Sequence, residues 1–426
     1  MVETKPFLPG QSCIKCLIFI VLNSLFLLNS SVVYSGEQSA EKERSCKTLR
    51  AMAKVYMACG DYKNAQGLAE QALNLAKETN ASDAELCACL LDLAYLYKNQ
   101  GRMADAETMC QRGLKLQEKI HDENHPYVAY TLRILSEIYQ GQARYRDATS
   151  ALERAMMIMR EIDPKDDRAI APLKIDIARL LVARGNFAEA ESCFTEAIVP
   201  IEQSYGPDHA YTANVLGSIA ALYAMQKRYD EAEELIYRTL RIQEKVYGPE
   251  HHFLVPTWLV MSEIYQAKGD YVNAKMLLEK SLLTTEKQQG LLHPLTGDVL
   301  NRLGQLYIAS KEYTGAEDTL QRAVKVLESS LGPDNDRTAI AINNLAKVYI
   351  HQGKYSQAQK LCQKALNTLE SVFDQYHPNV ADVLETMVQL HREAGNTAEA
   401  ARLEQRAEEI HARNQTAHRR IAKVTQ

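Results

Sequence analysis

One sequence pattern recurs nine times between about residue 45 and about residue 412, and most copies lie 42 residues apart. Each copy opens with an apolar segment that usually ends in tyrosine, as in LGSIAALY (216–223) and INNLAKVY (342–349). An alanine follows nine residues later in every copy, at Ala65, Ala106, Ala148, Ala190, Ala232, Ala274, Ala316, Ala358 and Ala400. Units repeated at a fixed period stack on their neighbours and bury a core between them. The repeat therefore predicts a solenoid.

The periodicity within each copy is helical. Apolar residues recur at positions i, i+3, i+4 and i+7, as in Leu216, Ile219, Ala220 and Tyr223, which is one face of an α-helix. In most copies a glycine then marks a turn, and a second segment carries the recurrent alanine. Small residues allow two antiparallel helices to approach closely, so each copy is expected to be a helical hairpin and the fold class all-α.

The overall composition agrees with a stack of exposed helices. The chain is 46% hydrophobic and 24% charged, which suits burial between neighbouring units and a solvated surface. A net charge of −5 argues against a nucleic-acid binder, which needs a concentrated basic face. Basic residues cluster only in a short tail, residues 413–426, at Arg413, Arg419, Arg420 and Lys423.

These positions resemble the tetratricopeptide repeat (TPR), whose leucine, tyrosine and alanine positions recur at the same offsets. The ordinary repeat has 34 residues, and the additional residues here form linkers such as QSYGPDHA (203–210) and KVYGPEHH (245–252). This longer form resembles the repeats of kinesin light chains. The resemblance implies a right-handed α-solenoid of about nine TPR hairpins over residues 45–412, with the second helices ending at glycines such as Gly206, Gly248 and Gly332.

The N-terminus has the layout of a secretory signal. Lys5 and Lys15 precede an apolar run from Cys16 to Leu28, and small residues around Ser35 offer a cleavage position. We expect residues 1–35 to be a signal peptide, residues 36–44 a linker, and the mature chain to be periplasmic or secreted. The alternative is a chain tethered to the membrane by an uncleaved segment 16–28.

Two residue types raise the question of a metal site. Histidines recur at one linker position, at His125, His209, His251, His293 and His377. Ligands one repeat apart cannot converge at about 2 Å, so a structural role at the helix start is expected instead. Five cysteines fall in the first two repeats, where packing as small apolar residues is favoured and one disulfide is left open: Cys46, Cys59, Cys87, Cys89 and Cys110.

Motifs of catalysis are missing from the sequence. We find no phosphate-binding loop, no G-x-S-x-G turn and no HExxH zinc motif. The sequence therefore predicts a chain that is not an enzyme, with no cofactor and no metal.

The resemblance also implies where a partner would bind. First helices line the concave face of such arrays, and kinesin-light-chain-type repeats commonly carry an asparagine pair there, whose amides can bond a peptide backbone. The candidates in repeats seven and eight are Asn301, Arg302, Gln305, Asn343, Asn344 and Lys347. Earlier repeats depart from the pattern and place Arg133, Glu137, Arg179 and Glu263 in these positions.

The sequence thus predicts an exported, non-catalytic scaffold that holds a peptide or a partner's helix in the concave groove, mainly through repeats five to eight. Two alternatives remain. A cytoplasmic adaptor like kinesin light chain is disfavoured, because the 44 residues before the repeats show no heptads. A self-associating architectural element needs no groove ligand. The partner, the pathway and the oligomeric state stay open.

Overall fold

The computed structural model describes residues 35–58, 61–163, 167–373 and 375–422, and side chains within 45–413. The expected signal peptide therefore lies outside the described residues apart from Ser35, as does Cys59. In the described part, no helix is sufficiently long and apolar to span a membrane.

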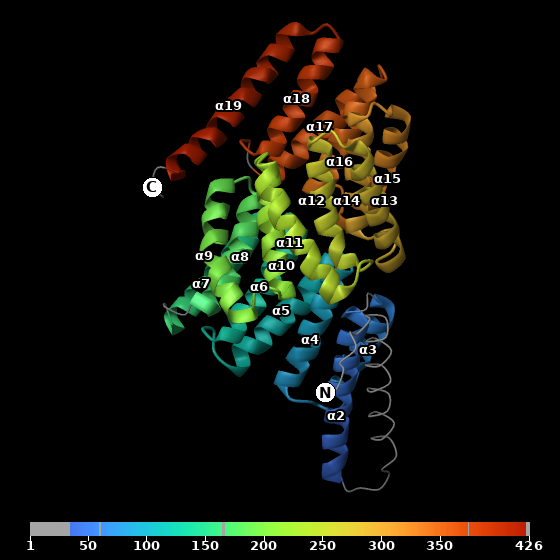
Figure 1. Ribbon diagram of the computed structural model, residues 1–426. Helices are drawn as coiled ribbons and strands as arrows, with labels where there is room; N and C mark the ends of the chain where they lie inside the picture. Colours follow the sequence, from blue (N-terminus) through green and yellow to red (C-terminus); the bar gives the residue numbers. More distant parts are fainter. Residues whose placement is uncertain (1–34, 59–60, 164–166, 374, 423–426) are drawn as a thin grey trace, which may run out of the picture.

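The described chain is helical throughout and contains no strand (Figure 1). The helices are α2 (Ser35–Ala58), α3 (Tyr62–Glu78), α4 (Asp83–Asn99), α5 (Met103–Ile120), α6 (Pro126–Gly141), α7 (Tyr145–Ile162), α8 (Asp167–Ala183), α9 (Phe187–Tyr205), α10 (Ala210–Met225), α11 (Tyr229–Tyr247), the 3₁₀ turn η1 (His252–Leu254), α12 (Val255–Ala267), α13 (Tyr271–Gln288), α14 (Pro294–Ala309), α15 (Tyr313–Leu331), α16 (Asp336–His351), α17 (Tyr355–Val372), α18 (Pro378–Glu393) and α19 (Thr397–Ala422). Successive pairs, from α2 with α3 to α18 with α19, form nine hairpins in the described residues.

Two boundaries differ from those expected. Residues 36–44, expected as a linker, belong to α2, because their glutamate, glutamine, alanine and lysine residues favour a helix. The final helix α19 continues to Ala422 and so includes most of the expected basic tail.

The two helices of each hairpin pack against each other at the recurrent alanines. Ala106, Ala232 and Ala316 are fully buried where the two helices of a pair cross. The turn between the helices uses one residue with positive φ, which is glycine in repeats such as the fourth (Gly185, φ 77°). Lys227 occupies the same left-handed position with φ 63°, so glycine is favoured at this turn without being required.

The linkers end the second helices as predicted. Gly206, Gly248 and Gly332 are the C-terminal caps of α9, α11 and α15, with φ between 90° and 95°. Proline follows each glycine and cannot continue the helix.

The array winds so tightly that its C-terminal repeats lie against its N-terminal ones (Figure 1). Five hydrogen bonds in the described residues join positions 190 to 194 apart, a separation of between four and five repeats. We call these five contacts the seam: Tyr62 with His252, Asn99 with His293, Gly141 with Asn335, Tyr145 with Asp336, and Ala183 with His377. Nothing in the repeat pattern predicts this second layer of contacts.

Candidate binding groove

The linker histidines act at helix starts, which confirms their expected structural role. In His125, His209, His251, His293 and His377 the ring Nδ1 accepts a hydrogen bond from the backbone N–H two residues later. Asn335 takes this N-cap position at the start of α16 with its side-chain oxygen.

Three of these caps serve two helix ends at once. Because Nδ1 of His293 accepts a hydrogen bond, its Nε2 carries the proton and donates to the carbonyl of Asn99, at 2.8 Å. His377 donates in the same way to Ala183 at 3.0 Å, and the Asn335 amide donates to Gly141 at 3.2 Å. These carbonyls end α4, α6 and α8 and have no partner within their own helix. The seam therefore satisfies otherwise unpaired backbone groups.

His252 forms the first contact of the seam and is nearly inaccessible, with 1% of its surface exposed. Its Nε2 lies 3.2 Å from the Tyr62 hydroxyl, and its Nδ1 lies 3.0 Å from Gln288 Oε1. Burial, together with the neighbouring His251, lowers its pKa to about 4. The imidazole is therefore neutral at neutral pH.

This burial makes the seam sensitive to acid. The unfolded chain binds a proton at His252 near pH 6.5, and the folded chain does so only near pH 4. Stability from this residue is therefore complete above pH 6.5 and falls as the pH is lowered, by on the order of 3 kcal/mol at pH 4. We expect His252→Gln to unfold with a shallower pH dependence than the parent between pH 7 and pH 4.5 in urea titrations. His209→Gln, at an exposed cap, is the control and should follow the parent's slope.

The inner face, which we define as the surface of the first helix of each pair, carries a ladder of ion pairs between neighbouring repeats. Each pair joins one first helix to the next. The repeat pattern alone does not predict which residue pairs with which. The pairs are Arg50 with Asp92 (2.7 Å), Lys98 with Glu137, Arg133 with Asp176 (2.6 Å), Glu263 with Arg302 (2.6 Å), Asp298 with Arg337 and Lys347 with Asp382 (2.8 Å). The charged inner face is thus already partly paired within the chain.

Three predicted site residues of the N-terminal half belong to one part of this ladder. Arg133 bonds to Asp176, Arg179 lies 3.7 Å from the same carboxylate, and Glu137 pairs with Lys98. Asp176 is 2% exposed, and burial raises its pKa despite the attraction of Arg133. Lys98 and the nearby arginines hold the pKa of Glu137 below its usual value. These side chains stabilise contacts between repeats.

The predicted asparagines also bond to one another across repeats. Asn344 donates to Asn301 Oδ1 at 2.9 Å, and Asn343 donates to Asp382 at 2.8 Å. Asn343 and Asn344 are only 1% and 2% exposed. Among the described residues, Asn343 Oδ1 is buried without a hydrogen-bond partner. The asparagine pair therefore connects α14, α16 and α18 in this structure.

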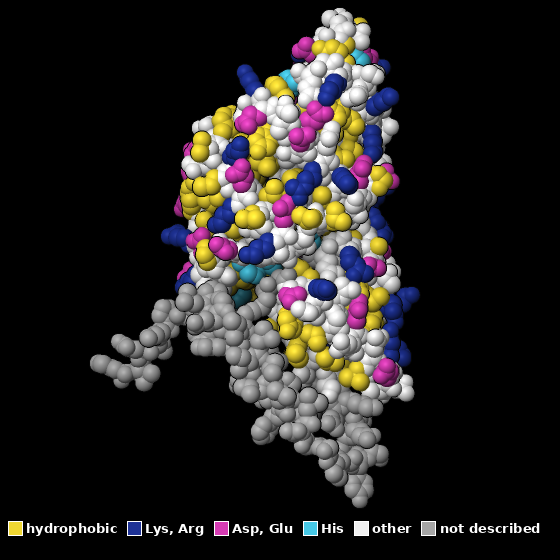
Figure 2. Space-filling view, turned by 90° about the vertical axis from the view of Figure 1, so that its right-hand side faces the viewer, with side chains coloured by type: hydrophobic (Ala, Val, Ile, Leu, Met, Phe, Trp, Pro, Cys, Tyr) yellow, Lys and Arg dark blue, Asp and Glu magenta, His cyan; other side chains and the backbone are white. Residues whose placement is uncertain are grey.

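The remaining predicted residues converge on one pocket of about 500 Å³. We call it the groove pocket; it is lined by Tyr229, Glu263, Gln266, Ala267, Tyr271, Arg302, Gln305, Ile308, Ala309, Asn344 and Lys347. It extends over repeats five to eight and combines both charges, amide groups and two tyrosine rings. On the face of the molecule drawn in Figure 2, basic and acidic side chains are likewise interspersed.

Sequence reasoning missed a larger cavity of about 820 Å³ at the N-terminal end. This aromatic cavity is bordered by Tyr62, Tyr95, Tyr127, Tyr130 and Phe253, with Arg50 and Asp92 among its polar residues. Tyr127 and Tyr130 are more than half exposed and lie three residues apart on α6. Exposed tyrosines at this spacing on a first helix are the signal that could have located it.

Two family models match the chain. The MalT-like TPR region matches residues 37–205, and the tetratricopeptide repeat model matches residues 169–245, 211–261, 254–329 and 337–413. A search of curated proteins found no match.

Several solved structures are similar to this chain. The TPR-like repeats of a Podosopora anserina protein described as a kinesin light chain are 22% identical, with a TM-score of 0.38 over 49% of this chain and 98% of theirs. BtubC (BKLC) from P. vanneervenii is 18% identical, with a TM-score of 0.39 over 58% and 90%. A Rap protein complexed with Competence and Sporulation Factor is 14% identical, with a TM-score of 0.55 over 78% and 99%. At this identity the likeness to the Rap protein concerns the fold alone.

Proposed function

The chain belongs to the tetratricopeptide repeat family, and on that premise we propose that it is a non-catalytic scaffold that binds a peptide segment of a partner protein in the groove pocket. The observation that carries the proposal is the convergence of Glu263, Arg302, Gln305 and Lys347 on one pocket of the inner face. The Rap protein of similar fold was solved in complex with Competence and Sporulation Factor, which gives partner binding a precedent in this fold.

The chemistry of the groove pocket suits an extended peptide. Gln266 and Gln305 each offer a donor and an acceptor, which a peptide backbone can use on both sides. The Arg302 and Lys347 side chains are 41% and 26% exposed, so each can bond to a ligand while remaining near its carboxylate partner. The packed repeats hold these groups in place before binding, which lowers the entropy cost of association.

The test compares two matched triple variants of the full chain. The groove variant carries Arg302→Ala, Gln305→Ala and Lys347→Ala. The control carries Lys325→Ala, Gln359→Ala and Lys360→Ala, which removes the same residue classes from exposed positions on α15 and α17. A displayed library of random peptides is selected on the parent, and the affinity of enriched peptides is then measured by fluorescence anisotropy.

We expect the groove variant to lose at least about tenfold in affinity, corresponding to about 1.4 kcal/mol, and the control to bind like the parent. Both variants must melt like the parent for the comparison to count. Enriched peptides that bind the groove variant as tightly as the parent would exclude the groove pocket as the binding site.

We also propose that the chain is exported, on the basis of its basic and apolar N-terminal segment. Cleavage after Ser35 would give a mature protein that begins at Gly36. N-terminal sequencing of the protein purified from its source tests this. A mature chain that retains residues 16–28 and sediments with membranes would support the tethered alternative instead.

A further inference from the structure

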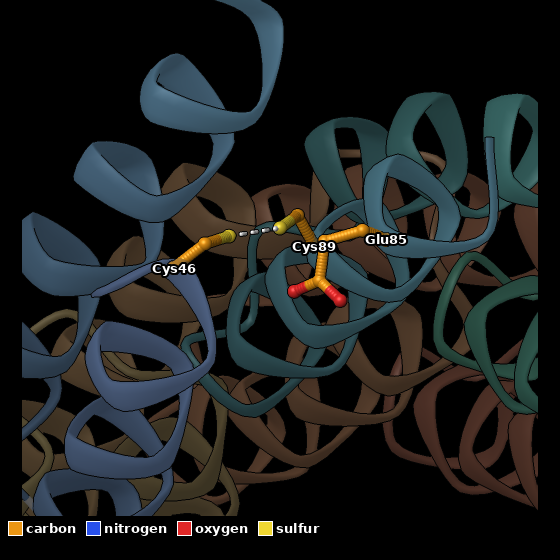
Figure 3. A group of neighbouring side chains, drawn as sticks. All are labelled: Cys46, Glu85 and Cys89. Carbon is orange, nitrogen blue, oxygen red and sulfur yellow. Dashed lines mark hydrogen bonds between the residues drawn. The ribbon is translucent and has the colours of Figure 1, made fainter. Parts of the chain in front are cut away.

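Three donor side chains converge between the first two repeats, away from the groove pocket. Cys46 lies on α2, and Glu85 and Cys89 lie one turn apart on α4 (Figure 3). The two sulfur atoms are 3.6 Å apart, and a carboxylate oxygen of Glu85 lies within 4.8 Å of both. All three residues are buried, with Cys46 and Cys89 at 2% and 1% exposed.

We propose that Cys46, Glu85 and Cys89 form a binding site for a thiophilic divalent cation, specifically Zn²⁺. Zinc binds thiolate sulfur at about 2.3 Å, so two thiolates on one tetrahedral ion lie about 3.8 Å apart. The observed 3.6 Å agrees with that separation. Zinc sites also accept carboxylate oxygen as a ligand, and three protein ligands leave one position for water or another group.

The charges of the surroundings permit such an ion. Binding one divalent cation releases two protons, one from each thiol, to the solvent, so the net charge of the buried site does not change. Arg50 donates to Glu85 at 3.0 Å and to Asp92 at 2.7 Å. It would hold the carboxylate in place as an outer-shell partner of a ligand.

The aromatic cavity lies next to the site. Arg50 and Asp92 line the aromatic cavity, and Arg50 bonds directly to Glu85. Arg50 therefore connects the wall of the cavity to the ligand carboxylate.

The sequence argument against a metal concerned the linker histidines, which should lie too far apart in different repeats, and the cysteines were expected to pack as small apolar residues. Cys46 and Cys89 are 43 residues apart and belong to adjacent repeats. The first helices of neighbouring repeats, here α2 and α4, are in contact, so a cysteine on one and a cysteine on the next can share an ion. The linker histidines do not have this relation, because each one caps its own helix.

The experiment uses the full chain, reduced and freed of metal with a chelator, and Cd²⁺ as a spectroscopic probe for Zn²⁺. Thiolate-to-cadmium charge transfer absorbs in the ultraviolet and reports coordination by cysteine directly. We expect one equivalent of Cd²⁺ to produce this absorption. Competition with Zn²⁺ should remove the absorption.

Cys89→Ala should lose the one-equivalent absorption. The matched control is Cys110→Ala, which removes another buried cysteine of the second repeat, one whose sulfur contacts the carbonyl of Thr131. It should bind like the parent. Glu85→Gln should retain the absorption with affinity reduced at least tenfold.

Three outcomes would overturn the proposal. These are absence of the absorption in the parent, equal loss in Cys110→Ala, or a Cys46–Cys89 disulfide in the unreduced chain together with no Cd²⁺ binding after reduction. Peptide binding at the groove pocket does not enter these measurements, so the two proposals stand or fall separately.

Discussion

Gly185→Ala should destabilise the protein by more than the chemically identical change Gly353→Ala. Both glycines end the first helix of a repeat with positive φ, 77° and 73°, so both substitutions carry the same backbone strain of about 1 kcal/mol. A Cβ atom at Gly185 would lie 2.6 Å from Cδ of Pro378, across the seam, whereas nothing lies within 4 Å at Gly353. Relieving this overlap should cost Gly185→Ala roughly 1–3 kcal/mol more.

Urea unfolding measures the difference in stability, and small-angle scattering measures the shape. We expect the radius of gyration to increase in Gly185→Ala, because the fourth and ninth repeats must separate, and to stay unchanged in Gly353→Ala. Gly269→Ala, with φ 80° and no neighbour within 4 Å, is a second control. Equal unfolding free energies for all three variants would mean that the seam is not closed in solution.

Arg133→Met should have the largest effect of a single substitution, about 3–5 kcal/mol of destabilisation. It removes the 2.6 Å partner of Asp176, a carboxylate that is 2% exposed, and leaves a buried charge compensated only by Arg179 at 3.7 Å. Arg179→Met removes the more distant partner and should cost clearly less. Thermal and urea unfolding of the two single variants make the comparison.

The double variant Arg133→Met with Asp176→Leu distinguishes two causes of the destabilisation, an uncompensated buried charge and lost side-chain packing. Removing both partners should restore most of the stability, because no charge then remains buried.

The pH dependence of the Arg133→Met deficit gives a second check. Burial raises the pKa of Asp176 in the folded state. As the pH falls, the folded chain therefore binds a proton at this carboxylate at a higher pH than the unfolded chain does. The deficit of Arg133→Met should therefore shrink as the pH is lowered from neutrality. A deficit independent of pH would point to packing instead.

The helices and turns of the fold were predictable because each repeat contains several local signals for the same hairpin. The buried alanines, the glycine caps of α9, α11 and α15 and the capping histidines lie where the repeat pattern places them. Local signals of this kind depend on residues within one hairpin or its neighbour. Even Asn335 was predictable in principle, since asparagine and histidine share the ability to cap a helix.

The seam and the exposure of the site residues were not predictable in this way. Contacts between residues 194 positions apart depend on the summed rotation of several repeats, and a small angle per repeat decides whether the coils meet. The asparagine prediction shows the same limit. A helix face can be assigned from spacing, but only the neighbouring helix decides whether Asn344 meets Asn301 or solvent. The N-terminal segment gave an expectation that the described residues do not address.

The seam changes how this molecule would respond to force. Most solenoids extend like open springs, because each coil is free to move away from the next. Here successive coils touch and are joined by hydrogen bonds at regular intervals, as in a spring wound with initial tension. Such a spring resists small loads almost rigidly and yields only when its coils part. A load on the ends of the chain would therefore be shared between coils until the seam opens, after which the array would lengthen readily.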